Sequence, residues 1–155
     1  MGLSKNKPIN SLSADWYTDD KFLKKEINQI FLKSWLLIGP ESHIPNPGDC
    51  LFQSIVDQPI VCVRQEDNSI KTFFNICRHR AGSFENKRSK NNYLVCKYHG
   101  WTYSIDGQLK GPRGFNKSEI ALKELCLKNI NTKIWKGLIF INFCNKPKSF
   151  DITFN

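Results

Sequence analysis

The chain has 155 residues, enough for one domain that buries about 70% of the surface its unfolded chain would expose. Its 23 Lys and Arg residues outnumber its 14 Asp and Glu residues, and the net charge of +9 favours an acidic partner over a basic one, although a solvated surface with no partner would look the same. No apolar run reaches the ~20 residues of a membrane helix, and residues 1–10 lack the apolar segment of a signal peptide. We therefore expect a cytoplasmic protein that needs no disulfides.

The N-terminal part of the chain predicts a flexible arm followed by one amphipathic helix. Residues 1–14 are mostly polar, and Asp19 and Asp20 then place acidic side chains at the start of a helix over residues 19–34. The apolar residues of this helix recur at intervals of three and four: Leu23, Ile27, Ile30 and Phe31. We interpret this stripe as core packing rather than as a surface for a membrane or a partner helix.

From Cys50 onward, short apolar runs alternate with turn residues, which is typical of an antiparallel β domain. Asp106 and Gly107 predict a hairpin turn, residues 110–114 an irregular segment, and residues 118–122 a short helical turn. The expected strands are residues 51–56, 60–64, 70–75, 93–95, 102–104, 126–129, 132–135 and 138–143.

Two short fragments carry the chemistry, and each follows a predicted strand. Cys77 and His79 are separated by one residue, and Cys96 and His99 by two. Two thiolates and two neutral imidazoles suit a [2Fe–2S] cluster in which the cysteines hold one iron and the histidines hold the other. Zinc also binds Cys2His2 sets, but the usual zinc finger pairs cysteine with cysteine in a much smaller unit, so zinc remains the less favoured alternative.

The residues around both fragments extend the pattern. Asn-Ile-Cys-Arg-His-Arg-Ala-Gly occupies positions 75–82, Cys-Lys-Tyr-His-Gly-Trp-Thr-Tyr occupies 96–103, and Asp-Gly-Gln-Leu follows at 106–109. Together with Pro-Gly-Asp at 47–49 and Trp-Lys-Gly-Leu-Ile-Phe-Ile-Asn at 135–142, they resemble the N-terminal Rieske domain of the large subunit of Rieske-type non-haem iron oxygenases. That family includes ring-hydroxylating and quaternary-amine oxygenases.

The resemblance implies a fold, a cofactor and a function. The fold would be mainly β: an antiparallel domain like that of Rieske iron–sulfur proteins, with one N-terminal amphipathic helix and a cluster-binding subdomain. The cofactor would be a Rieske [2Fe–2S] cluster bound by Cys77, His79, Cys96 and His99. The function would be one-electron transfer from a ferredoxin or flavin reductase to a mononuclear Fe(II) site in a catalytic domain or neighbouring subunit.

The residues next to the predicted ligands distinguish the oxygenase type of Rieske protein from the respiratory type. Gly82 and Tyr98 stand where respiratory Rieske proteins have a disulfide, and Trp101 stands where they have a serine that donates to a cluster sulfur. We therefore expect a reduction potential toward the low end of the Rieske range of about −150 to +300 mV. Tyr98 and Trp101 are expected to shield the cluster, and Gly82 and Gly100 to permit tight loop geometry near it. Arg80 is expected either to stiffen its loop or to belong to a docking face.

The remaining histidine and cysteines are expected to have structural roles. A mononuclear iron site of the oxygenase type needs two histidines and a carboxylate, and only His43 is left, so we expect no oxygen activation by this chain alone. It is then an oxygenase component without a complete oxygenase active site. The cysteines expected in the core are Cys50, Cys62, Cys126 and Cys144.

Three interpretations of the whole chain remain open. It is a fragment of an oxygenase large subunit, a free-standing Rieske ferredoxin, or a zinc-stabilised module that binds nucleic acid. The third lacks a recognisable nucleic-acid-binding motif. Residues 15–145 would form the domain, between the arm and a linker or tail over 146–155. Lys87, Arg88 and Lys90 would form a docking patch for an acidic electron donor, or a plain solvated loop.

Overall fold

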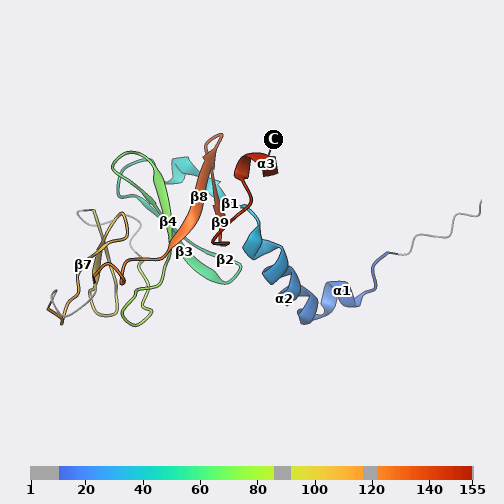
Figure 1. Ribbon diagram of the computed structural model, residues 1–155, viewed down its shortest axis with the longest axis horizontal. Helices are drawn as coiled ribbons and strands as arrows, with labels where there is room; N and C mark the ends of the chain where they lie inside the picture. The colour runs from blue at the N-terminus through green and yellow to red at the C-terminus, as the bar shows by residue number, and fades with distance from the viewer. Residues whose placement is uncertain (1–10, 86–91, 117–121, 155) are drawn as a thin grey trace, which may run out of the picture.

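The computed structural model describes residues 11–85, 92–116 and 122–154 (Figure 1). The predicted basic patch at 87–90 and most of the predicted helical turn at 118–122 lie outside these residues. The helical elements are α1 (Asp15–Thr18), α2 (Asp20–Gln29), η1 (Phe31–Lys33), η2 (Glu41–His43) and α3 (Phe150–Phe154). The strands are β1 (Leu36–Pro40), β2 (Cys50–Ile55), β3 (Gln58–Arg64), β4 (Ile70–Phe74), β5 (Tyr93–Val95), β6 (Thr102–Ser104), β7 (Leu109–Gly111), β8 (Asn129–Trp135) and β9 (Leu138–Asn142).

The strands form two antiparallel sheets, which confirms the predicted fold class. The larger sheet has the order β1-β9-β8-β4-β3-β2, and the smaller has the order β5-β6-β7. The larger sheet curls so that its two edge strands, β1 and β2, approach each other. Their proximity is shown by the Gln53 side chain on β2, which donates to the Ile38 carbonyl on β1 at 3.2 Å. The smaller sheet lies at one end of the molecule and α2 at the opposite end (Figure 1).

Strand β3 is buried on both faces because it separates two apolar cores. Val61 and Val63 belong to the core that also holds Phe73 and lies beneath the smaller sheet. Ile60 and Cys62 point to the other face and belong to the core inside the larger sheet, as the two-residue period of a strand requires. All five side chains are 0% exposed, and burying each of the valines, the isoleucine and the phenylalanine stabilises the fold by about 1.5–3 kcal/mol.

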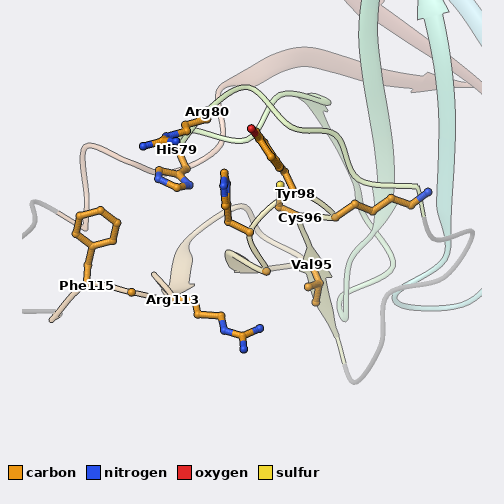
Figure 2. A pocket seen from close by; sticks show the side chains of 11 residues that line it. His79, Arg80, Val95, Cys96, Tyr98, Arg113 and Phe115 are labelled. Atoms are coloured by element: carbon orange, nitrogen blue, oxygen red, sulfur yellow. The ribbon is translucent and has the colours of Figure 1, made fainter.

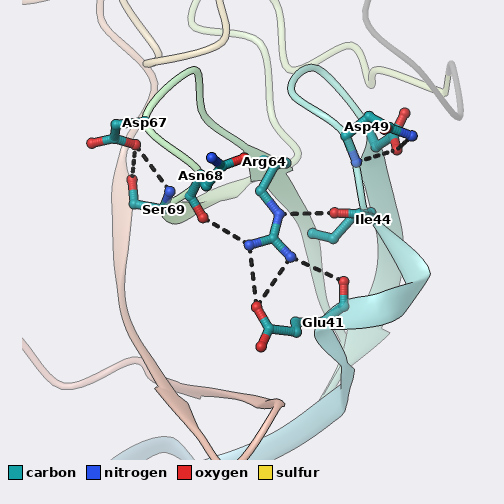
Figure 3. Close-up of polar contacts among 8 residues, drawn as sticks. Glu41, Ile44, Asp49, Arg64, Asp67, Asn68 and Ser69 are labelled. Carbon is teal, nitrogen blue, oxygen red and sulfur yellow. Dashed lines mark hydrogen bonds and ion pairs between the residues drawn. The ribbon is translucent and has the colours of Figure 1, made fainter.

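A buried arginine ties β3 to the segment after β1 (Figure 3). Arg64 is 7% exposed, and its Nε donates to the Ile44 carbonyl at 2.8 Å. Its two terminal nitrogens donate to Glu41 Oε2 at 3.2 and 3.1 Å, and one of them also donates to the Asn68 carbonyl at 2.7 Å. The guanidinium therefore donates hydrogen bonds to backbone carbonyls of two loops, and without Arg64 these carbonyls would lose a donor.

The predicted N-terminal helix is present in part, but the interpretation of its apolar stripe as core packing is wrong. The helix is divided into α2 and the 3-10 turn η1, and α2 contains no buried residue. Leu23 is 52% exposed and Ile30 is 54% exposed. The reason is that α2 projects away from the sheet, as Figure 1 shows, and the chain is fixed only beyond it, where Asn142 donates to the Lys33 carbonyl at 3.1 Å.

Other differences concern the edges of the strand set. Two strands lie outside the expected set: β1 follows the predicted helix, and β7 overlaps the start of the segment 110–114 that the sequence predicts to be irregular. Residues 126–128 are not a strand, and β8 begins at Asn129. In the predicted tail, Phe150 is buried and packs against Trp35 with a ring-centroid distance of 5.2 Å. The division into arm, domain and tail stays a prediction.

The cysteine prediction is right for two of four positions. Cys50 and Cys62 are buried, whereas Cys126 and Cys144 are only half-buried, and none of the six cysteines is in a disulfide. Burial raises the pKa of the Cys62 thiol to about 11, so it stays neutral as a core residue does. Within the described parts of the chain, no helix combines the length and the apolar character needed to cross a bilayer.

Replacing Arg64 by leucine is expected to lower the free energy of unfolding by about 2–4 kcal/mol, because buried carbonyls lose their donors. Glu41→Gln is the matched control and should cost less than about 1 kcal/mol, since that side chain is 37% exposed and water can replace the pairing. Denaturant unfolding measures both. Equal losses in the two variants would show that the ion pair, not the carbonyl contacts, carries the stabilisation.

Candidate metal centre

The structure brings the four predicted ligands together at the outer end of the smaller sheet. Cys77 and His79 lie in the turn after β4, and Cys96 and His99 lie in the turn between β5 and β6. The two imidazole rings are 4.6 Å apart between centroids, and both cysteines are 2% exposed. Each turn therefore places its thiol inside the protein and its imidazole nearer the surface.

The two turns are built in the same way by the backbone. The N–H of Cys77 donates to the carbonyl of Gly82 at 2.7 Å, and the N–H of Cys96 donates to the carbonyl of Trp101 at 2.8 Å. Each bond closes a loop of a few residues that begins with the cysteine. The ligand spacing seen in the sequence is thus held by two similar hydrogen-bonded turns rather than by a helix.

Gly82 lies where the two turns touch. A Cβ atom at this position would lie 2.8 Å from Cys96 Sγ and 2.9 Å from Tyr98 Cβ, closer than real Cβ contacts. Gly100 meets a different requirement, because its φ of +72° is in the left-handed region that favours glycine. The glycines singled out in the sequence therefore permit close approach of the turns in one case and backbone conformation in the other.

His79 is the member of the set that most clearly lacks a partner. Its Nδ1 atom is the one buried side-chain nitrogen or oxygen among the described residues that has no hydrogen-bond partner, and such a group costs about 1–3 kcal/mol when left unsatisfied. Burial, with smaller contributions from His99 and Arg80, lowers the pKa of His79. The imidazole is therefore neutral at pH 7, which is the form that binds a metal.

The cysteine side of the site is apolar and short of countercharge. Burial raises the pKa of the Cys77 thiol, and the neighbouring Cys96 adds to the increase, whereas Tyr103 opposes it. A Cys77 thiolate is therefore disfavoured here without a nearby cation, so the pocket fits a metal group that supplies one. Among the described residues no three His, Cys, Asp or Glu side chains are placed to hold a single metal ion. A [2Fe–2S] cluster needs only two protein ligands at each iron, whereas structural zinc needs four around one ion.

Tyr103 is a residue of the site that the sequence analysis did not assign. It is 0% exposed, its hydroxyl lies 3.4 Å from Cys77 Sγ, and it accepts a hydrogen bond from the Arg78 N–H at 3.1 Å. Burial, followed by the contact with Cys77, raises the pKa of Tyr103, so the hydroxyl keeps its proton. That proton is available to a Cys77 thiolate, which supplies a donor to sulfur although the serine of respiratory Rieske proteins is replaced by Trp101.

Aromatic rings surround the imidazoles unequally. His79 stacks on Trp101, with a centroid distance of 4.6 Å and an interplanar angle of 6°, and Trp101 is 3% exposed. His99 is contacted by Tyr98 at 3.8 Å, but Tyr98 is 62% exposed. Trp101 is thus buried against His79, whereas Tyr98 lies on the surface beside His99, and a shielding role for either ring stays a prediction.

The imidazoles open onto a surface pocket of about 820 Å³ (Figure 2). Arg80 lines it at the mouth of the site, and the described lining residues include no Asp or Glu that could pair with this guanidinium. The segment after β7, with Arg113 and Phe115, lines it as well, although the sequence analysis assigned it no role. His43 lines a different pocket, beside Asp49.

Replacing Gly82 by alanine is expected to push the two turns apart, because the new methyl group would overlap Cys96 Sγ and Tyr98 Cβ. The iron and acid-labile sulfide content of the purified protein should fall well below that of the parent. Gly137→Ala is a suitable control, since it lies in the turn between β8 and β9, outside the site, and a Cβ there meets nothing closer than Glu41 Oε1 at 3.9 Å, although its φ of +77° adds some strain. Full metal content in Gly82→Ala would contradict the close-approach explanation.

Replacing Tyr103 by phenylalanine is expected to lower the reduction potential, because a hydrogen bond to sulfur favours the more negative, reduced state. A loss of about 1 kcal/mol corresponds to a decrease on the order of 40–50 mV for one electron. Potentiometric titration measures the shift, and metal content checks that the site is intact. A potential that stays unchanged would mean that the hydroxyl does not donate to Cys77.

Comparison with known proteins agrees with this geometry. The family model described as the Rieske [2Fe–2S] domain matches residues 34–125, more than half of the chain. The chain is 36% identical over 142 residues to the biphenyl dioxygenase subunit alpha of Metapseudomonas furukawaii, covering 82% of this chain and 30% of that protein. It is 33% identical over 142 residues to the glycine betaine monooxygenase oxygenase subunit of Pseudomonas aeruginosa, covering 91% of this chain and 33% of that protein.

A solved structure extends the similarity to the fold. A quaternary ammonium Rieske monooxygenase superimposes with a TM-score of 0.82 and 25% sequence identity, covering 89% of this chain and 39% of that chain. The present chain therefore spans about a third of the length of the relatives it matches. The family match and the arrangement of thiols and imidazoles lead to the same conclusion: the chain belongs to the Rieske [2Fe–2S] domain family.

Proposed function

We propose that this chain carries single electrons from a reductase to the mononuclear iron of an oxygenase, with Cys77, His79, Cys96 and His99 as the ligands of its [2Fe–2S] cluster. The observation that carries the proposal is the meeting of two similar turns that enclose both thiols and leave a buried His79 Nδ1 without a partner. When bound, the cluster supplies a reversible one-electron couple whose added electron resides on the histidine side.

The protein supplies three things to that couple. Cys77 and Cys96, both 2% exposed, hold the sulfur side away from water. Tyr103 places a donor on Cys77, which stabilises negative charge at that sulfur. His79 and His99 line the open pocket, so the side that takes up the electron faces the surface from which a redox partner would approach.

The acceptor and substrate class follow from the relatives, as proposals for this chain. The relatives include a biphenyl dioxygenase and a glycine betaine monooxygenase, so an aromatic ring or a quaternary amine is the substrate class we propose for the oxygenase system. One solved relative, a quaternary ammonium Rieske monooxygenase, is linked to carnitine oxidation and to electron transfer between subunits. By analogy with that relative, we propose that the acceptor iron for this chain belongs to a neighbouring subunit.

The donor we propose is a ferredoxin or flavin reductase with an acidic surface, because the chain carries a net charge of +9. The reducing cytoplasm is the setting we propose, since the six cysteines form no disulfide.

The ligand assignment is tested by replacing Cys96 with alanine. The parent protein, prepared without oxygen, should contain about two irons and two sulfides per chain and should show a paramagnetic signal after reduction by dithionite. Cys96→Ala should lose the iron, the sulfide and the signal, because Cys77 would be left as the single thiolate on the cysteine side and one thiolate does not hold that iron. Cys144→Ala is the matched control, a half-buried cysteine outside both turns, and should keep all three. Zinc without sulfide in the parent protein would contradict the proposed function.

A further inference from the structure

The segment after β7 forms a third wall of the metal centre. Pro112 is buried, and the Phe115 N–H donates to its carbonyl at 3.0 Å, which closes a turn. Trp101 Nε1 donates to the Arg113 carbonyl at 3.2 Å, so the turn is attached to the ring on which His79 is stacked. The segment is therefore fixed to the site by a hydrogen bond as well as by its position in the chain.

Phe115 completes the aromatic enclosure of one imidazole. Its ring meets His79 edge-on at 5.9 Å and 80°, and it meets Trp101 edge-on at 5.8 Å and 87°. His79 is thus covered by the Trp101 face on one side and approached by the Phe115 edge on another. Because Phe115 is itself 47% exposed, it adds little to the apolar core, and its contacts are with the site.

The pocket mouth is cationic. Its described lining contains Arg80, Lys97 and Arg113 and no Asp or Glu. Lys97 is paired with Glu85, which compensates that charge outside the pocket. Figure 2 shows Arg80 and Arg113 on opposite sides of the pocket, with Phe115 at its edge. Two guanidiniums that flank an aromatic surface are complementary to carboxylates, with which they form charge-assisted hydrogen bonds. A surface of this kind favours an acidic partner over a hydrophobic one.

We propose that residues 112–116 form a selective wall at this pocket: Arg113, with Arg80 opposite, attracts the carboxylates of an acidic electron-transfer protein, while Phe115 limits direct access to His79. This inference rests on the proposed function, because it requires a redox group held by the two turns. Steering by such charges changes association rates by 10-fold to 1,000-fold and weakens steeply with salt.

The charge part of the proposal is tested with small redox probes and the full chain in its metal-loaded, reduced form. Ferricyanide, an anion, and hexaammineruthenium(III), a cation, each accept one electron from the reduced protein, and stopped-flow absorbance follows the rate. Taking the ratio of the two rates largely removes the effect of a changed potential, which acts on both in the same direction. Arg113→Gln should lower the ferricyanide-to-ruthenium ratio about threefold or more at low salt, and the difference should vanish near 1 M salt, where the screening length is about 3 Å.

Lys110→Gln is the matched control for charge. Lys110 lies on β7 and lines a different pocket, near Asp106, so its replacement removes the same charge from the same hairpin but not from the mouth of the site. The ratio should stay at the parental value. A ratio that falls equally in both variants would show that only the net charge matters and would overturn the role of Arg113.

The shielding part is tested by Phe115→Ala, with Phe115→Leu as the apolar control. The alanine variant should accelerate oxidation by both probes several-fold without altering their ratio, and should increase deuterium coupling to the paramagnetic signal in heavy water. The leucine variant should behave like the parent. Unchanged rates and coupling in Phe115→Ala would overturn the shielding role.

The two proposals fail in different ways. A preparation without iron, sulfide and a reducible signal overturns the proposed function and this inference together. A normal signal with an unaltered probe ratio in Arg113→Gln overturns the inference alone.

Discussion

The close approach of the two ligand turns is the constraint on which the metal centre depends. Gly82 leaves no room for a methyl group between its own turn and Cys96 Sγ, so both thiols are brought into one dry compartment. Nothing covalent joins the turns, since no disulfide is present. Their separation is set instead by packing, by two backbone hydrogen bonds within each turn, and by the Lys97 N–H, which donates to the Ser83 carbonyl at 3.3 Å. A site held by packing is sensitive to small changes in side-chain volume.

The sheet arrangement explains why this compartment is rigid. β4 runs directly into the first turn and lies between β3 and β8 in the larger sheet, whereas the second turn belongs to the smaller sheet. The two sheets share the apolar core around Phe73 and Tyr103, so the thiols are held by a continuous set of buried side chains. Tyr103 then has two functions, because the same ring packs in this core and its hydroxyl reaches Cys77. One residue therefore links the packing of the core to the surroundings of the Cys77 sulfur.

The two ends of the molecule differ in their exposed surfaces: one carries a cationic pocket and the other exposed apolar side chains. The metal centre opens on a cationic pocket, whereas α2 has no buried side chain and exposes Leu23, and Ile30 directly after the helix is exposed as well. A ten-residue helix gains most of its stability in water from packing of its apolar face, and α2 receives little of this support from the domain. Phe150 differs from α2 in this respect. The sequence predicts that it lies in a tail, but it packs against Trp35, just after η1.

The sequence by itself determined the family, the mainly β architecture and the four candidate ligands, because these depend on short spacings and on alternation within single strands. Tertiary structure alone decided which apolar residues are covered: an amphipathic period shows that a helix has an apolar face, but not what lies against that face. The same holds for Tyr103 and Phe115, whose partners Cys77 and His79 lie far away along the chain. Contacts of this kind arise only when separate turns are brought together by the sheets, and no local pattern records them.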